Sequence, residues 1–482
     1  MKRYQLLLLG VALLSSAWLN AQNFGDALRY SLLEPTGTAR FMGAGSALGP
    51  MGADFSVIST NPAGLAWMRK SEFMITPGLN INTTTSTLAN GSADLAYDDA
   101  EVQFTLPNIG IVTSSRGGSG METFNFAIGL NRLADFNQQF YFEGNSKGSI
   151  VQRFEELAND GGLDDFEAGV AFDAQALIED NGFYYSDFSD FPDAVINRNQ
   201  TVSRTGGLSE IAFGFAGNVK NKLLWGLSLG IPLLNYDEEK TYREMDTDDT
   251  VLFFDDLRYS EQLTATGSGI NLKLGFIYRA DQALRLSLAV HTPTYYQIDE
   301  TFSSDMTYNY TFENVKYTGT AESPIGNFNY GLRTPWRFLG GVGTVFGEHG
   351  FLSGEVEYVN YANNRFLFDG FAGDEAEINK ATADNLASAV NIRTGGEYVL
   401  GSFLLRGGVG LQQAPIVGDD SFYSTFSLGL GVRQKRYFFD FAYRRSGVKS
   451  TYTPYQVTNG SPQFVDNNVT KESFVLTAGF RW

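Results

Sequence analysis

The sequence predicts an all-β protein, a transmembrane antiparallel β-barrel of about 14 strands with an N-terminal plug, or hatch, inside its lumen. Three observations predict this fold. The chain begins with a secretory signal, apolar and polar residues then alternate with a period of two, and the connectors alternate in length. We expect a signal peptide over 1–21, the hatch over 22–70, and the barrel with long extracellular loops over 71–482.

The N-terminus carries the layout of an export signal. Lys2 and Arg3 precede a short apolar core, Leu6 to Leu14, and small residues lead to a cleavage site after Ala21. The apolar run is shorter than the ~20 residues that span a bilayer as a helix. No later stretch is long enough either. We therefore expect export across the inner membrane and localisation in the cell outer membrane of a Gram-negative bacterium.

Alternation of period two is the main signal for strands. In 270–279, apolar residues at every even position oppose Asn271, Lys273, Gly275 and Arg279. The same pattern recurs in four further segments: 225–231, 284–291, 403–412 and 437–444. The faces opposite the apolar residues mix Gly, Ser and Ala with charges. A barrel with lipid outside and a crowded polar lumen inside predicts this mixture.

Connector lengths provide the second signal. Strands are expected near 71–84, 101–115, 121–135, 208–218, 222–236, 262–279, 283–297, 328–346, 350–363, 389–400, 402–413, 421–434, 436–450 and 470–482. Connectors of a few residues alternate with long ones at 136–207, 237–261, 298–327, 364–388 and 451–469. Outer-membrane barrels have an even strand number, short periplasmic turns and long extracellular loops. This pattern therefore orients the chain in the membrane.

The last predicted strand ends on apolar residues that share one face, including Phe480 and Trp482. An alternating final strand with a terminal aromatic residue resembles the signal that the barrel-assembly machinery reads. We therefore expect that machinery as a partner, with Phe480 and Trp482 as the assembly signal.

The first long loop combines a predicted short helix over 150–160 with a later aromatic cluster. The cluster consists of Phe183, Tyr184, Tyr185, Phe188 and Phe191. One interpretation is a loop that packs on itself. The other is an apolar surface that captures a hydrophobic ligand.

Composition excludes several kinds of chemistry. The net charge of −19 argues against a nucleic-acid partner, which needs a basic surface. The absence of cysteine excludes disulfides, thiol catalysis and zinc–thiolate sites. Two histidines remain, His291 and His349. His291 leaves a lipase triad or a haem site as minor alternatives. A lone histidine is weak evidence for either, and we expect no catalytic residue, no metal and no cofactor.

Residues 22–70 are not strand-like. Phe24 to Leu33 fits a short helix, and a turn-rich segment with many glycines follows. The stretch from Gly37 to Gly45, then Asp54 and Asn61-Pro62-Ala63-Gly64-Leu65-Ala66, resembles the FadL/TodX family of outer-membrane transporters. In the FadL/TodX family an N-terminal hatch with an Asn-Pro-Ala motif plugs a 14-stranded barrel. The signal-peptide residues around Ala21 resemble those of signal peptides from Bacteroidetes.

The resemblance implies passive uptake of hydrophobic molecules such as long-chain fatty acids or aromatic hydrocarbons. Ligand would be captured among the extracellular loops, move to a lumenal pocket, and leave sideways into outer-membrane lipid after a hatch shift. Asn61, Pro62, Ala63 and Gly64 would then be hatch or gating residues. Physically, Pro62 favours an extended or turn conformation at Asn61, whose amide would pin the hatch. A simple turn is the alternative.

Two other functions remain open from the sequence. One is a partner-binding barrel of type IX secretion, similar to PorV, which would dock a secreted protein. The other is a passive polar pore, which a hatch would obstruct. The lumenal charges also have two interpretations, namely structural pairing across the lumen or an arginine that holds a ligand carboxylate. They are Lys273, Arg279, Arg285, Glu355, Glu357, Arg393, Glu397, Arg406, Arg433, Asp440, Arg444 and Arg481.

Overall fold

The computed structural model describes residues 24–89, 91, 95–118, 120–458, 460 and 462–482. The expected signal peptide lies outside these residues. Within them, no helix is both long enough and apolar enough to cross a membrane.

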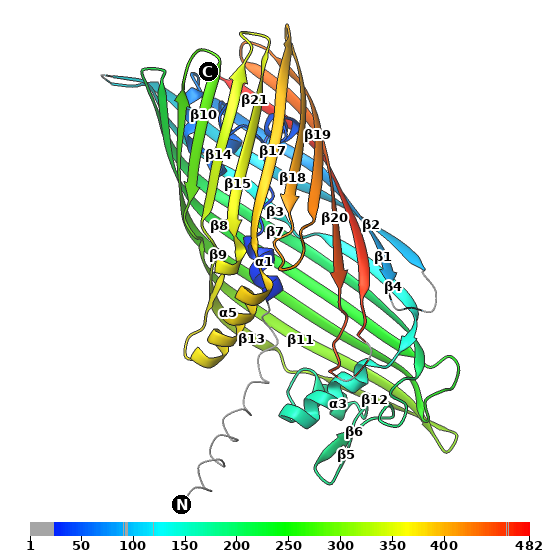
Figure 1. The fold of residues 1–482 in the computed structure, drawn as a ribbon. Helices are drawn as coiled ribbons and strands as arrows, with labels where there is room; N and C mark the ends of the chain where they lie inside the picture. The colour runs from blue at the N-terminus through cyan, green and yellow to red at the C-terminus, as the bar shows by residue number, and fades with distance from the viewer. Residues whose placement is uncertain (1–23, 90, 92–94, 119, 459, 461) are drawn as a thin grey trace, which may run out of the picture.

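The wall is a closed antiparallel β-barrel of 14 strands (Figure 1), which confirms the predicted fold class. β1 pairs with β21 from Glu72–Arg481 to Leu88–Val465, so the sheet has no open end. In order around the barrel the strands are β1 (Glu72–Leu88), β2 (Ala96–Arg116), β3 (Met121–Asp135), β7 (Val195–Val219), β8 (Leu223–Met245), β9 (Phe254–Arg279), β10 (Leu284–His291), β14 (Arg337–Val345), β15 (Gly350–Asn360), β17 (Ser388–Leu400), β18 (Phe403–Gln413), β19 (Phe422–Arg433), β20 (Tyr437–Tyr452) and β21 (Val465–Arg481).

The side chains alternate as the sequence predicted. On β9, Leu274 and Phe276 are exposed on the outer face, whereas Lys273 is buried on the lumen side. The long connectors, however, are shorter than predicted. β7 already begins at Val195, inside the expected loop 136–207. There the residues facing inward are polar as often as apolar, so hydropathy alone does not reveal a strand.

Five further strands extend the wall toward the long loops. β4 (Gln138–Lys147), β11 (Tyr295–Phe312), β13 (Gly326–Arg333) and β16 (Arg365–Leu367) each continue a wall position after a break, and β12 (Val315–Glu322) pairs with β11. Short turns and the C-terminus lie at the opposite end (Figure 1), which we call the short-turn end; the other is the loop end.

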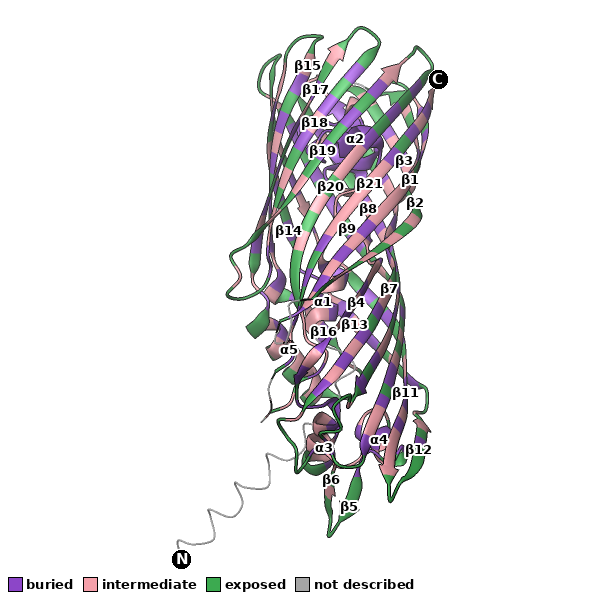
Figure 2. Cartoon of the chain, turned by 90° about the vertical axis from the view of Figure 1, so that its right-hand side faces the viewer, coloured by how far each residue is buried: buried purple, intermediate pink, exposed green. Residues whose placement is uncertain are grey.

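The loop end carries its own small elements, most of them drawn at the bottom of Figure 2. The predicted loop helix is present as α3 (Ile150–Gly161), and Ser149 caps its N-terminus in a capping box with Gln152. The others are α4 (Ala168–Asp173), the hairpin of β5 (Ile178–Asp180) and β6 (Phe183–Tyr185), η3 (Tyr361–Asn363) and α5 (Ala372–Asn385).

The N-terminal segment fills the lumen with four short helices. These are α1 (Phe24–Ser31), α2 (Ala39–Gly43), η1 (Phe55–Ser59) and η2 (Pro62–Trp67). α2 is buried inside the barrel (Figure 2). Glycines let the two backbones meet: a Cβ on Gly43 would lie 2.9 Å from the Cα of Gly429 on β19. The glycines of the lumen face therefore make room for the hatch.

Candidate functional site

Asn61 ties the hatch to the barrel wall. It is buried and caps η2, with its side-chain oxygen accepting from the N–H of Ala63 at 3.2 Å. Its amide nitrogen donates to the carbonyl of Gly49 at 3.3 Å and to that of Phe276 on β9 at 3.4 Å. One side chain thus links η2, an earlier turn of the hatch and the wall.

The other residues of the Asn-Pro-Ala-Gly motif are held by close packing within the hatch. Pro62 occupies the first turn of η2, where its missing N–H costs nothing. Gly64 lies against Gly52, and a Cβ on Gly64 would come within 2.8 Å of the Cα of Gly52. Ala63 is buried in the hatch core. The structure therefore brings all four predicted hatch residues together at one point beside β8 and β9.

A second anchor joins the glycine-rich stretch of the hatch to the far wall. Arg40 lies 3.2 Å from the carboxylate of Glu397 on β17 and donates to the carbonyl of Ala53 at 2.7 Å. Thr38 donates to Asp54 at 2.8 Å and caps α2. The sequence singled out this stretch only by resemblance. The structure adds a charge pair that holds the hatch to the wall.

His291 has a structural partner. Its Nε2 donates to the carbonyl of Thr60 in the hatch at 2.7 Å, and the ring is buried. The neighbouring Glu210 accepts from Ser59 at 2.8 Å and pairs with Lys273. The lumenal histidine therefore holds the hatch one residue before Asn61. His349 lies exposed in the turn between β14 and β15.

The wall is interrupted between β3 and β4. β3 ends at Asp135, β4 begins at Gln138, and both pair with β7. On its other side β3 pairs with β2 only from Asn108 to Arg116. Among the described residues no ladder joins β4 to Ala96–Pro107 of β2. We call this unpaired stretch between β2 and β4 the seam.

The break lies on the lumen side of β2. Asn82 of β1 donates to the carbonyl of Asn137 at 2.7 Å, and Asn80 donates to Asp135 at 3.1 Å. Because β2 stands between β1 and β3 in the wall, these bonds require the chain at the break to bend inward. Only side chains close the seam: Asn137 bonds to Gln103, and the rings of Tyr97 and Tyr141 meet at 5.1 Å. Side chains move far more easily than a ladder of backbone hydrogen bonds.

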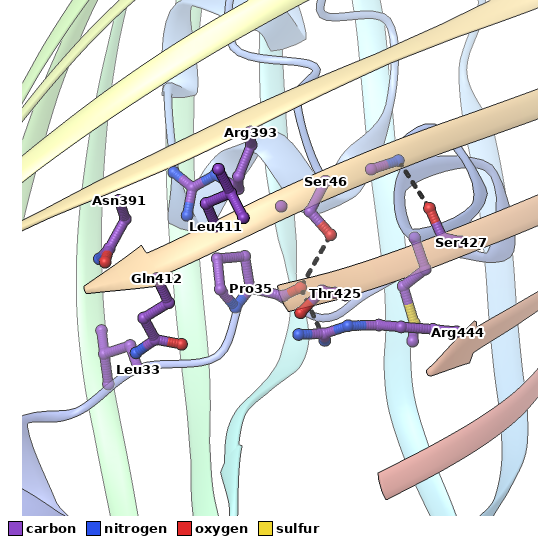
Figure 3. A pocket seen from close by; sticks show the side chains of 13 residues that line it. Leu33, Pro35, Ser46, Asn391, Arg393, Leu411, Gln412, Thr425, Ser427 and Arg444 are labelled. Carbon is purple, nitrogen blue, oxygen red and sulfur yellow. Dashed lines mark hydrogen bonds between the residues drawn. The ribbon is translucent and has the colours of Figure 1, made fainter. Parts of the chain in front are cut away.

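Two small cavities lie inside the lumen, and one of them lies beside the seam. This one is lined by Glu34, Thr36 and residues at the end of β3, including Arg132 and Asp135. The other, shown in Figure 3, lies between the hatch and β17–β20, and Met42 and Arg444 line both. Their volumes are about 30 and 40 Å³. Since one water needs ~10–15 Å³ on this scale, each cavity holds a few waters and no hydrophobic ligand. The hatch is closed in this conformation.

Most of the lumenal charges pair as structural bridges. Arg393 lies 2.7 Å from Glu355 and 3.2 Å from Glu357, and Arg406 lies 2.7 Å from Glu397 and 2.6 Å from Asp440. The pairs of Arg393 and the Arg406–Glu397 pair join neighbouring strands, whereas the Arg406–Asp440 pair reaches from β18 past β19 to β20. The prediction of pairing across the lumen is thus confirmed. Two partners were not in the predicted set. Arg337 pairs with Glu357, and Glu210 pairs with Lys273.

Arg444 differs from these arginines. Its guanidinium donates to the carbonyl of Pro35 at 3.5 Å (Figure 3), and the residue lines both cavities. In the described part of the chain no carboxylate lies within 4.0 Å of it. Burial lowers the solvation of this cation, and an anionic ligand would supply the missing partner.

The predicted capture residues do not form one surface. Phe188 is buried in the core of the loop end and contacts Phe254 at a ring distance of 5.0 Å. Phe183 and Tyr185 are exposed on the β5–β6 hairpin, Tyr184 contacts Phe172, and Phe191 is exposed. Burial also raises the pKa of the adjacent Asp187, although the hydrogen bond that Tyr308 donates to it lowers that pKa. Capture by this cluster stays a prediction for the exposed rings.

The predicted assembly signal lies at the closure of the barrel. Phe480 stacks on Trp482 at 5.8 Å and contacts Tyr437 of β20 at 5.3 Å. The N–H of Trp482 donates to the carbonyl of Ser71, the residue before β1. The last residues of the chain therefore join its first and last strands.

Comparison with known proteins shows the fold. The chain matches no protein-family model and no curated protein. Among solved structures, a Pseudomonas aeruginosa FadL homologue superposes with a TM-score of 0.55 at 11% identity, over 93% of this chain and 99% of that one. The P. putida toluene transporter TodX gives a TM-score of 0.51 at 10% identity, over 93% of this chain and 99% of that one. The chain therefore shares the fold of these two structures over 93% of its length.

Proposed function

We propose that this chain is an outer-membrane transporter for the passive uptake of hydrophobic molecules, with a lateral route from lumen to lipid through the seam. The seam carries this proposal, because no backbone ladder joins β2 to β4 there and side chains alone separate lumen and lipid. The shared fold with a FadL homologue and with a toluene transporter supports it. The hatch argues against an open polar pore.

A lateral route suits the physics of an apolar ligand. Release into water gains nothing, whereas entry into lipid is favourable by roughly 25 cal/mol per Å² of apolar area. On the lipid side the seam is bordered by Phe104, which is 88% exposed, and by Val102. Transport down this gradient needs no coupled energy source and no catalytic residue, so we propose a transporter rather than an enzyme.

Arg444 favours an amphipathic ligand. A neutral hydrocarbon would leave its guanidinium without an anionic partner, whereas a long-chain fatty acid would supply a carboxylate and an apolar tail. The surrounding lumen offers further polar groups, including Ser46 and Gln412 (Figure 3). Among the two ligand classes open from the sequence, we therefore propose fatty acids over aromatic hydrocarbons.

The seam can be tested with a reversible lock. The chain has no native cysteine, so Gln103→Cys with Asn137→Cys can be joined by a short cross-linker with a reducible disulfide, because the two side chains already bond. Uptake of a fluorescent fatty acid into cells should fall when the pair is cross-linked and return on reduction. Asn145→Cys with Asn197→Cys, treated alike, is the matched control, because these hydrogen-bonded residues join β4 and β7, which are already paired. Equal uptake by the cross-linked seam lock and the control would reject the lateral route.

An exposed apolar patch at the loop end favours a second candidate, a partner-binding barrel of the type IX kind. Leu252, Phe253, Phe312 and Val315 are exposed there, and Phe253 contacts Phe312 at 5.4 Å. Mass spectrometry of the gently purified protein separates the candidates. A stoichiometric fatty acid supports the transporter, whereas a stoichiometric large protein without a small molecule supports the secretion role.

A further inference from the structure

Charge is distributed unevenly around the short-turn end. The turns on one side carry Arg69 and Lys70 before β1, Lys220 and Lys222 between β7 and β8, and Lys435 and Arg436 between β19 and β20. On the opposite side the turns after β9 and β14 carry acidic residues, Asp281 and Glu348, and the turn after β17 is Gly-Ser. The cationic arc stands out in a chain whose net charge is −19.

Four of these cations gather where the barrel closes. The carbonyl of Arg436 accepts from the N–H of Arg481 at 2.7 Å, and the carbonyl of Ser71, next to Lys70, accepts from Trp482 at 3.1 Å. Lys435 and Arg436 therefore flank the end of β21 on one side, and Arg69 and Lys70 flank it on the other. All four side chains are exposed.

Within the residues that the structure describes, none of the four cations has an ion-pair partner. In the described part of the chain no carboxylate, the C-terminal one included, lies within 4.0 Å of any of them. The nearby acid Glu72 is already bound to Arg481 at 2.6 Å. An unpaired cluster of like charge is unfavourable by itself and attracts an anionic ligand.

An aromatic platform lies between the two pairs of cations. Tyr437 and Trp482 are each 54% exposed and contact Phe480 between them. Tyr437 and Phe480 are paired across β20 and β21 and face outward, toward lipid. Aromatic girdles mark the level at which a barrel leaves the hydrocarbon and meets the headgroups. The cations therefore stand at headgroup height.

We propose that Arg69, Lys70, Lys435 and Arg436, with Tyr437 and Trp482, form a binding site for an anionic phospholipid of the inner leaflet. We call it the closure site. Its cations bind the headgroup phosphate, and its rings contact the glycerol and the upper acyl chains. Rings that face the hydrocarbon favour a lipid over an acidic soluble protein, which would have to enter the membrane to reach them. The site does not depend on what the barrel transports.

Native mass spectrometry of the full chain, released from vesicles of phosphatidylglycerol and phosphatidylcholine, tests the closure site. The wild type should retain phosphatidylglycerol preferentially. The variant R69Q/K70Q/K435Q/R436Q should retain at least about tenfold less, since each cation near an anionic surface contributes to binding. Retention by the wild type should also fall as salt is raised, because these charges are exposed to screening.

The control removes the same charge elsewhere. K147Q/K316Q/K380Q/K449Q neutralises four exposed lysines on the loop-end side of the chain and should retain phosphatidylglycerol like the wild type. Barrel folding of each variant is checked by heat-modifiable migration on gels. Equal retention by both variants, or equal retention of the two lipids by the wild type, would overturn the proposal. An acidic protein that copurifies with the wild type and not with the closure-site variant, without lipid preference, would overturn it in favour of protein docking.

Discussion

Replacing Asn61 with alanine should loosen the hatch without preventing barrel assembly. The substitution removes the N-cap of η2, which is worth about 1 kcal/mol. It also removes the donor to the carbonyls of Gly49 and Phe276. Both bonds are long, at 3.3 and 3.4 Å, so we assign them together about 1 kcal/mol. The sum, about 2 kcal/mol, corresponds to a roughly 30-fold rise in the population of displaced hatch.

Two measurements check this magnitude. Hydrogen exchange of the amides in η2 should accelerate by a similar factor, because exchange reports local opening. Uptake of a fluorescent fatty acid, or leak of a small solute, should rise in cells with equal surface levels of the two proteins. The barrel wall should keep its exchange protection, since the wall ladders do not involve Asn61.

Asn61→Asp is the matched control. Aspartate still accepts from the N–H of Ala63 and caps η2, but it cannot donate to Phe276. Its effect therefore separates the cap from the link to the wall. If Asn61→Ala inserts normally and neither uptake, leak nor exchange of η2 changes, Asn61 does not hold the hatch and the gating role is wrong.

Three further predictions concern other parts of the chain. Deleting Trp482 should lower the amount of heat-modifiable barrel in the outer membrane, because it removes the ring stacked on Phe480 and the bond to Ser71; normal surface levels would contradict the assembly role. Arg444→Gln should weaken uptake of a fatty acid more than that of a neutral alkane, by roughly tenfold for one charge-assisted pair, and Arg444→Lys should restore part of it; an equal loss for both ligands would exclude carboxylate binding. Phe188→Ala should destabilise the loop end by about 3–5 kcal/mol, as for other buried phenylalanines, whereas Phe183→Ala, at an exposed ring, should not. The protease sensitivity of the loops measures the difference between the two variants.

Alternation along the chain was enough to predict the wall of the barrel. Alternation places Leu274 toward lipid and Lys273 toward the lumen, since adjacent side chains of a strand point to opposite faces. It also located a strand at each of the 14 wall positions. The segment before Ser71 was distinguished because its glycines and prolines break every strand pattern. These features are local, so a window of residues is enough to read them.

Contacts between distant segments, which the sequence does not reveal, set where the wall opens and which residues meet. β4 begins just after Phe136 and Asn137, inside the stretch 136–207 that was predicted as a loop, and only the missing partner on β2 turns this break into a seam. Alternation gives the face of Arg444 but not its neighbours, so it could not tell this arginine from the paired Arg406. The closure site likewise unites turns from opposite ends of the chain. Contacts between distant segments depend on register and closure, which no local pattern encodes.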